Sequence, residues 1–197
     1  MKHLGRKLYH ISGGLGLLSL YYILGRERAL FLYAVLFCLV LAADILRLTV
    51  PAVNRFVYSR FSAFIRRDEE HKLTGTEAYV LGIGLSLYLF PAPIASAAIC
   101  FLACGDVAAT AIGERYGHTK IGNKSLEGTL AFILAAAVAG FLLPLAGIPV
   151  MHEILLLGAF VAAAVELLPL PLNDNLVIPL VSGGVMDLVA RMTGWTA

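Results

Sequence analysis

Long apolar stretches, separated by short polar segments, run along almost the whole chain. They lie at about 8–24, 29–48, 74–90, from 94 onward, 128–148, 154–168 and 175–192. A helix needs about 20 mostly apolar residues to cross a bilayer, so the pattern predicts about seven membrane-spanning helices. We therefore expect an all-α, polytopic transmembrane helical bundle in which residues 1–197 form a single catalytic domain.

The interval between the second and third stretches has a different pattern. Aromatic and aliphatic side chains alternate there with arginines, which is typical of an amphipathic helix lying at the membrane interface. The apolar members of this pattern are Phe56, Phe61, Phe64 and Ile65.

Composition supports the membrane assignment and limits where a site can be. Hydrophobic residues make up 59% of the chain and charged residues 14%, whereas soluble domains have about 25% charged residues. Seven crossings nearly exhaust the length, so any site must be built from helix ends and short loops. The three cysteines lie in apolar stretches and are expected to pack, with no disulfide or metal role. The first stretch lacks a small-residue cleavage site, so we expect no cleavable signal peptide.

The distribution of basic residues predicts the orientation. In a seven-helix arrangement, twelve of the 15 Lys and Arg residues fall on the side of the N-terminus, and three fall on the other side. Basic residues concentrate on the cytoplasmic side of membrane proteins. The N-terminus is therefore expected to be cytoplasmic. The residues that could form a catalytic or binding site are expected on the same side, where nucleotides are found.

Those residues are concentrated between positions 105 and 128. On a helix, Asp106, Ala109 and Gly113 would share one face, leaving room for a ligand beside a carboxylate. From Gly113 the chain is expected to open, through Gly117, into a loop whose N–H groups can face anions.

Two lysines and a helix start follow that loop. Lys120 and Lys124 add positive charge, and a helix expected from about Ser125 would offer further N–H donors. A metal-binding carboxylate, a glycine-rich turn, two lysines and a helix start match the needs of a nucleotide triphosphate.

Each of these residues also has an ordinary structural interpretation. Asp106 could pair with a lysine, the glycines could serve helix packing, and Ser125 and Glu127 could cap a helix. Elsewhere, Asp44 could pair with Arg47 one turn away. The full set within 23 residues favours a nucleotide site.

The segment resembles the CTP-binding signature of the polyprenol kinase family, which includes dolichol kinase, phytol kinase and the CTP-dependent diacylglycerol kinase of fungi. Phosphatidate cytidylyltransferases share a more distant form of it. The matching pattern is Asp106-x-x-Ala109-x-x-x-Gly113-x-x-x-Gly117-x-x-Lys120-x-x-x-Lys124-Ser125-x-Glu127-Gly128. Further matching positions are Arg6-Lys7-x-x-His10, Leu73-Thr74-Gly75 and Asp174-Asn175-x-x-Ile178-Pro179.

The resemblance implies a CTP-dependent kinase that phosphorylates the hydroxyl of a lipid alcohol, such as a polyprenol, a phytol-like isoprenoid or diacylglycerol. Asp106, helped by Asp174, would hold Mg²⁺, and Lys120 and Lys124 would neutralise the transferring phosphoryl group. Gly113, Gly117, Ser125, Glu127 and Gly128 would complete the nucleotide site. The general base stays open among His10, Glu69 and Glu70.

Two other functions compete with this one. A cytidylyltransferase acting on a lipid phosphate could use much the same triphosphate site. A small transporter or structural membrane protein would instead need charges along a path through the bilayer, and the fifth apolar stretch contains none. We expect the bilayer, the lipid and the nucleotide as partners and no nucleic acid. The sequence leaves the lipid and the oligomeric state open.

Overall fold

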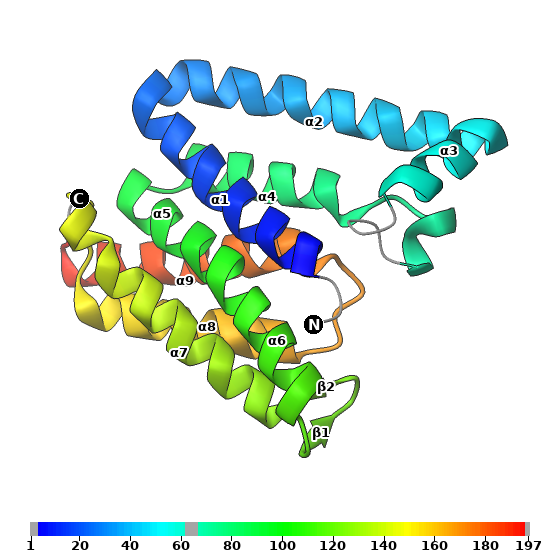
Figure 1. Cartoon of the computed structure of the whole chain (residues 1–197). Coiled ribbons are helices and arrows are strands. Elements are labelled where there is room, and N and C mark those ends of the chain that lie inside the picture. The colour runs from blue at the N-terminus through cyan, green and yellow to red at the C-terminus, as the bar shows by residue number, and fades with distance from the viewer. Residues whose placement is uncertain (1–3, 62–66, 196–197) are drawn as a thin grey trace.

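The structure is a computed structural model that describes residues 4–61 and 67–195 (Figure 1). Its long helices are α1 (Leu4–Leu24), α2 (Arg26–Thr49), α4 (Gly75–Leu89), α5 (Ala92–Cys100), α6 (Asp106–Tyr116), α7 (Leu126–Leu142), α8 (His152–Leu167) and α9 (Asp174–Thr193). The shorter ones are α3 (Pro51–Phe61), the 3₁₀-helices η1 (Arg67–His71) and η3 (Pro144–Ala146), and the π-helical turn η2 (Phe101–Gly105).

Helices occupy all seven places where the apolar stretches lie, since α5, η2 and α6 form one continuous helix. Four helices are long and apolar enough to cross a membrane: Arg26–Thr49, Ala92–Tyr116, Leu126–Ala146 and Asp174–Thr193. α4 and α8, with 15 and 16 residues, are shorter. The predicted helical fold with apolar helices of membrane-spanning length is therefore confirmed, and crossing by all seven helices stays a prediction.

Burial separates a central helix from peripheral ones. In the helix from Ala92 to Tyr116, 67% of the most apolar 18-residue segment is buried, and small residues such as Ala97 and Ala98 are fully enclosed. In α2, which lies at the edge of the bundle in Figure 1, only 17% of the corresponding apolar segment is buried. Side chains such as Phe31 and Leu39 point outward from it. An apolar helix that exposes such side chains is suited to lipid rather than to water.

The connections are sorted between the two ends of the bundle. At the right in Figure 1 lie the start of α1, the helices α3 and η1, the start of α4, the α6–α7 connection and the α8–α9 connection. The α1–α2 turn, the α7–α8 connection and the end of α9 lie at the other end. We call the first group the site end, because the predicted site residues fall there.

Three sequence-based expectations need correction or limitation. The fold is not purely α-helical, because β1 (Lys120–Ile121) and β2 (Lys124–Ser125) form an antiparallel hairpin. The chain does not open at Gly113, because α6 continues to Tyr116; one glycine costs a helix only about 1 kcal/mol. The predicted interfacial helix corresponds to α3, whereas Phe64 and Ile65 lie outside the described residues.

Candidate active site

Asp106 lies inside the long central helix, at the point where a π-helical turn gives way to α6. Such turns add one residue to a helix and re-aim the side chains that follow. The Asp106 carboxylate is 22% exposed, and its Oδ2 lies 3.7 Å from Nε2 of His10 on α1. His10 stacks on the ring of Tyr79, whose hydroxyl donates to the His10 carbonyl. α1, α4 and α6 therefore converge at Asp106.

A small polar cavity of about 50 Å³ lies on the α1 side of Asp106. Its walls come from α1, η1, the start of α4, α6, the α8–α9 connection and the start of α9. They include Arg6, Lys7, His10, Glu69, Thr76, Tyr79, Asp106, Thr110, Asn173 and Asn175. We call it the α1 cavity.

A larger polar cavity of about 270 Å³ lies on the other side, toward α7 and the β-hairpin. It is lined by charged side chains and by residues with little or no side chain. They include Asp106, Ala109, Thr110, Gly113, Lys120, Asn123, Lys124, Ser125, Gly128, Glu166 and Asp174. We call it the hairpin cavity. Asp106 and Thr110 line both cavities and so form a shared wall.

Lys124 is the central cation of the hairpin cavity. Its Nζ lies 2.9 Å from Glu166 Oε1 and 2.8 Å from Asp174 Oδ2, and it also donates to the backbone carbonyl of Glu166. Burial alone would lower the pKa of Lys124, but hydrogen bonds and the charges of Asp174 and Glu166 outweigh it and raise the pKa. Lys124 is therefore a fixed positive charge at neutral pH.

The hairpin brings both lysines to the same cavity. Lys120 pairs with Ser125 in the register, and the chain reverses at Gly122, whose φ of 59° suits glycine. Leu126 N donates to Thr119 O across the base of the hairpin. Lys120 is exposed at the rim, so its charge faces anything that enters from the site end.

Ser125 and Glu127 both have structural roles, which the sequence analysis gave as the alternative to nucleotide binding. Ser125 Oγ accepts from Gly128 N and caps α7, and Ser125 also lines the hairpin cavity. The Glu127 carboxylate accepts from Thr119 N at 3.0 and 3.2 Å and so fastens the hairpin. Glu127 does not line the hairpin cavity.

The glycines allow α6 to cross the start of α7 closely. A Cβ added at Gly128 would lie 2.9 Å from Ala109 O, and one at Gly113 would lie 3.0 Å from Ser125 Oγ. Gly113 and Gly128 also line the hairpin cavity, whereas Gly117 does not. A Cβ at Gly117 would come within 2.4 Å of Gly113 O, so packing alone explains that glycine.

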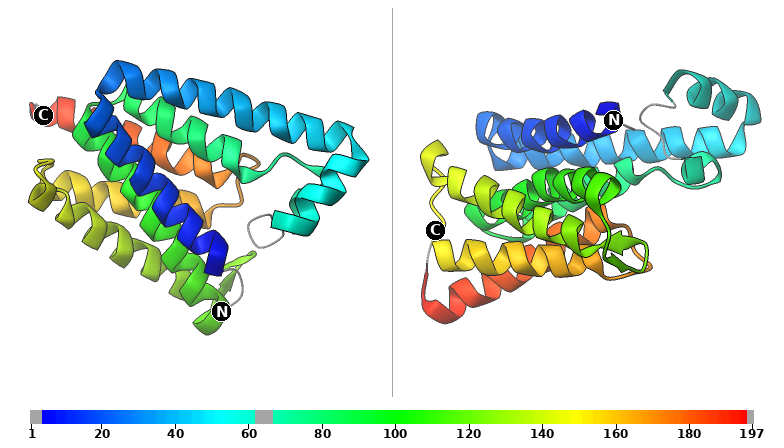
Figure 2. Two further views of the ribbon diagram at one scale, coloured as in Figure 1. Left: turned by 45° about the horizontal axis from the view of Figure 1, so that its top comes forward. Right: turned by 60° about the horizontal axis from the view of Figure 1, so that its bottom comes forward.

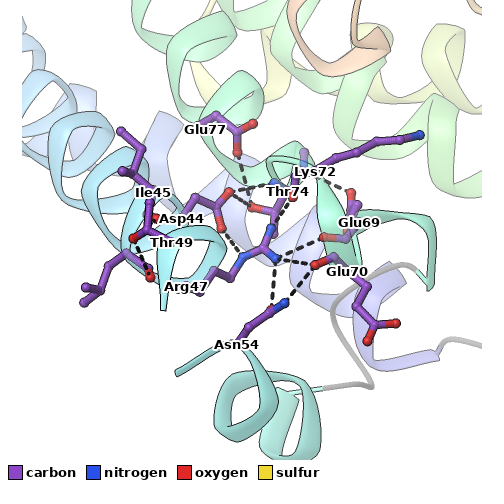
Figure 3. A network of polar contacts seen from close by, with 12 residues as sticks. Asp44, Ile45, Arg47, Thr49, Asn54, Glu69, Glu70, Lys72, Thr74 and Glu77 are labelled. Carbon is purple, nitrogen blue, oxygen red and sulfur yellow. Dashed lines mark hydrogen bonds and ion pairs between the residues drawn. The ribbon is translucent and has the colours of Figure 1, made fainter. Parts of the chain in front are cut away.

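The two neighbouring glutamates differ in position. Glu69 Oε1 accepts from Gly75 N at 3.0 Å, and Glu69 lines the α1 cavity. Glu70 is exposed and joins the surrounding network through its backbone carbonyl, while its carboxylate points away (Figure 3). Of the two, Glu69 lies at the site.

Figure 3 shows the network that holds the segment from η1 to α4. Arg47 Nε pairs with Asp44 Oδ1 at 2.6 Å, as the sequence suggested, and its other nitrogens donate to the carbonyls of Glu69 and Lys72. Asp44 Oδ2 accepts from the backbone N–H and hydroxyl of Thr74. The spacing of Asp44 and Arg47 predicted the pair but gave no signal of these long-range contacts.

The site contains few side chains that could bind a metal ion. Within 4–61 and 67–195, no three His, Cys, Asp or Glu side chains are close enough to hold a metal ion by themselves. Mg²⁺ commonly takes one or two carboxylates together with substrate phosphates. Asp106 offers such a carboxylate between the two cavities, whereas Asp174 is already engaged by Lys124.

The apolar bundle and the charged cavities at one end define a helical membrane protein with a polar site among its helix ends. The chain is 28% identical to the CTP-dependent diacylglycerol kinase 1 of Saccharomyces cerevisiae over 94% of its length and 73% of that protein. It is 30% identical to the CTP-dependent diacylglycerol kinase 1 of Eremothecium gossypii over 93% of its length and 66% of that protein. The chain belongs to the polyprenol kinase and CTP-dependent diacylglycerol kinase family.

Another relative has a length close to that of this chain. An uncharacterised protein of Rickettsia prowazekii is 28% identical over 89% of this chain and 88% of its own length. No family model matches the chain. No solved structure matches it either.

Proposed function

We propose that the protein is a CTP-dependent kinase that transfers a phosphoryl group to the hydroxyl of a membrane lipid alcohol. The observation that carries this proposal is the pair of polar cavities separated by Asp106 and Thr110. One cavity has the charge and size for a triphosphate, and the other opens beside a histidine. The names of the fungal relatives supply the donor and the reaction, and they favour a kinase over a cytidylyltransferase.

The triphosphate would occupy the hairpin cavity. Lys124, held in place by Glu166 and Asp174, and Lys120 at the rim would neutralise phosphate charge. The start of α7 beside Gly128 would add the positive end of a helix dipole. Cations fixed before the substrate arrives need no reorganisation during phosphoryl transfer.

The acceptor hydroxyl would enter the α1 cavity. His10 lies in reach of both that cavity and Asp106, and Tyr79 fixes its ring by stacking. His10 is therefore the best-placed general base for the lipid hydroxyl, and Glu69 is the second candidate. The exposed carboxylate of Glu70 is the weakest of the three.

Mg²⁺ fits the shared wall as a cofactor bound together with the triphosphate. Asp106 would be its main protein ligand, with Asp174 as a helper once the triphosphate shares Lys124. When bound, Mg²⁺ would neutralise charge on the bridging phosphate oxygens. The carboxylate of Asp106 would then orient the phosphate toward the α1 cavity.

We further propose that all seven helical segments cross the membrane and that the site end is cytoplasmic. The grouping of the site-end connections supports this, since they carry most of the basic residues. α4 and α8 would cross as short, largely buried helices, and CTP would reach the hairpin cavity from the cytoplasm.

The test uses purified protein in detergent with Mg²⁺, CTP labelled on the γ-phosphate, and a panel of lipid alcohols. We expect label on one class of lipid and release of CDP. Labelled pyrophosphate, formed only when a lipid phosphate is supplied, would instead indicate a cytidylyltransferase. No transfer to any lipid of either kind would contradict the proposal.

A further inference from the structure

An apolar groove of about 380 Å³ lies next to the α1 cavity. It runs along α1 and is walled by α2 and α4. Its lining comprises Tyr9, Ser12, Gly13, Gly16, Leu17, Leu20, Leu36, Tyr79 and Val80. We call it the glycine groove.

The glycine groove adjoins the polar site. Tyr9 and Tyr79 line both the groove and the α1 cavity. Tyr79 also stacks on His10, which lies beside Asp106. A molecule that spans the two spaces would therefore have a polar group next to the reacting residues and an apolar part along α1.

The sequence of α1 forms the floor of the groove. Ser12, Gly13, Gly16, Leu17 and Leu20 recur with helical spacing on one face. A Cβ added at Gly16 would meet no atom within 4 Å, and one at Gly13 would only touch the Tyr79 ring at 3.5 Å. Close helix packing therefore does not explain Gly16, in contrast with Gly117 and Gly128.

The groove is also open to the outside of the bundle. Ser12 and Gly16 are exposed, and they lie in a helix that also exposes apolar side chains such as Ile23. In a bilayer this opening would face hydrocarbon, so a membrane lipid could enter sideways without passing through water.

We propose that the glycine groove holds the hydrocarbon tail of the acceptor lipid and presents its hydroxyl at His10 and Asp106. This inference rests on the proposed kinase function for the identity of the hydroxyl. The apolar lining of the groove would accept an unbranched or an isoprenoid chain behind the hydroxyl-bearing end. Both chain types share that chemistry, and the test distinguishes them.

A second apolar groove, of about 270 Å³, runs between α2 and α4 past Tyr33, Gly84 and Tyr88. It shares only Val80 with the glycine groove and no residue with the α1 cavity. A tail in this second groove would lie away from the α1 cavity, because the two spaces have no lining residue in common. It therefore serves as the internal comparison.

The test fills each groove with the same side chain. Gly16→Trp fills the glycine groove, Gly84→Trp fills the second one, and Leu15→Trp adds a ring next to Gly16 but outside the groove. We expect Gly16→Trp to lower kcat/KM for long-chain acceptors about tenfold or more, because contact with several methylene groups is lost. Short-chain analogues and the KM for CTP should change less than about twofold, a difference under 0.5 kcal/mol. Acyl and isoprenoid acceptors are assayed separately, and the affected class identifies the tail.

Photocrosslinking tests the groove independently of turnover. A lipid alcohol with a diazirine in its tail is irradiated with the wild-type protein without CTP, and we expect labelled peptides from α1 around Gly16. Transfer in the wild type with equal losses in all three variants, or with loss only in Gly84→Trp, would overturn the groove assignment. Crosslinks at α1 without any transfer from CTP would overturn the kinase proposal and leave the groove standing.

Discussion

At the scale of single residues, the site depends on charges that the fold fixes in place. Asp106 is the clearest example, since it forms the wall between the two cavities and has His10 3.7 Å away. The sequence identified Asp106 because its spacing from Ala109 and Gly113 predicted a carboxylate facing open space. Spacing could not place His10 beside Asp106, because 96 positions separate the two residues along the chain; only the family resemblance assigned His10 to the same site.

Asp106→Asn is expected to reduce phosphoryl transfer about 100-fold or more, the scale seen when one preorganised electrostatic group is lost. The change keeps the size of the side chain, so the thermal unfolding temperature in detergent should stay near that of the wild type. Asp187→Asn is the matched control, because Asp187 pairs with Arg191 near the far end of α9. Full activity in Asp106→Asn would exclude the metal assignment.

The two lysines are expected to behave differently when changed to Met. Lys124→Met leaves Glu166, whose side chain is only 7% exposed, without its partner. It should destabilise the protein by roughly 2 kcal/mol, somewhat below the cost for fully buried pairs. Lys120 is exposed, so Lys120→Met should raise the KM for CTP and leave unfolding unchanged. Equal stability losses in the two variants would contradict these assignments.

At the scale of elements, the site is assembled by segments that hold one another. The hairpin of β1 and β2 carries the lysines, and the segment from η1 to α4 carries Glu69 and Thr76 to the α1 cavity. The helices were predictable because their apolar stretches are long. The hairpin was not, because strands of two residues have no periodic pattern, and Gly122 gives only a turn signal.

The π-helical turn before Asp106 was also beyond sequence reasoning. The stretch Phe101 to Gly105 is apolar and compatible with an ordinary α-helix. Gly105 packs tightly there, since an added Cβ would lie 2.6 Å from the Phe132 ring. Tertiary packing of this kind can change the helix register locally without leaving a periodic signal in the sequence.

Arg47 is expected to be the main support of the segment from η1 to α4. Arg47→Ala would remove the donors to Asp44 Oδ1 and to the Lys72 carbonyl, and one of the donors to the Glu69 carbonyl. Loss of such a buried partner costs about 3–5 kcal/mol. Thermal unfolding in detergent measures the loss, and activity should fall as Glu69 shifts.

Arg60→Ala is the control for this change, since Arg60 is exposed on α3. Its effect should stay within about 0.5 kcal/mol, as for most surface substitutions. A similar loss of stability in both variants would show that the Arg47 network contributes no more to stability than an exposed arginine does.

At the scale of the whole molecule, the polar chemistry gathers at one end of an apolar bundle. Charge distribution along the sequence predicted this grouping, and Figure 2 shows the start of α1 and the hairpin at the same end in both views. The two grooves could not be predicted, because they depend on how α1, α2 and α4 lean against one another.

Labelling with a membrane-impermeant maleimide tests the orientation. In a variant without the three native cysteines, His118→Cys reports on the site end and Leu145→Cys reports on the opposite end. In sealed inside-out vesicles we expect labelling of Cys at position 118 and protection at position 145. The reverse pattern would place the site end outside, and labelling at both positions would contradict seven crossings.

The shared wall of Asp106 and Thr110 has a consequence for the order of events. A donor in one cavity and an acceptor in the other meet across the same two residues, so both must be present before the phosphoryl group moves. Initial velocities measured against both substrates should give intersecting lines in double-reciprocal plots, not parallel ones. The protein should likewise fail to exchange label between CDP and CTP when no acceptor is present, because no phosphorylated enzyme would form.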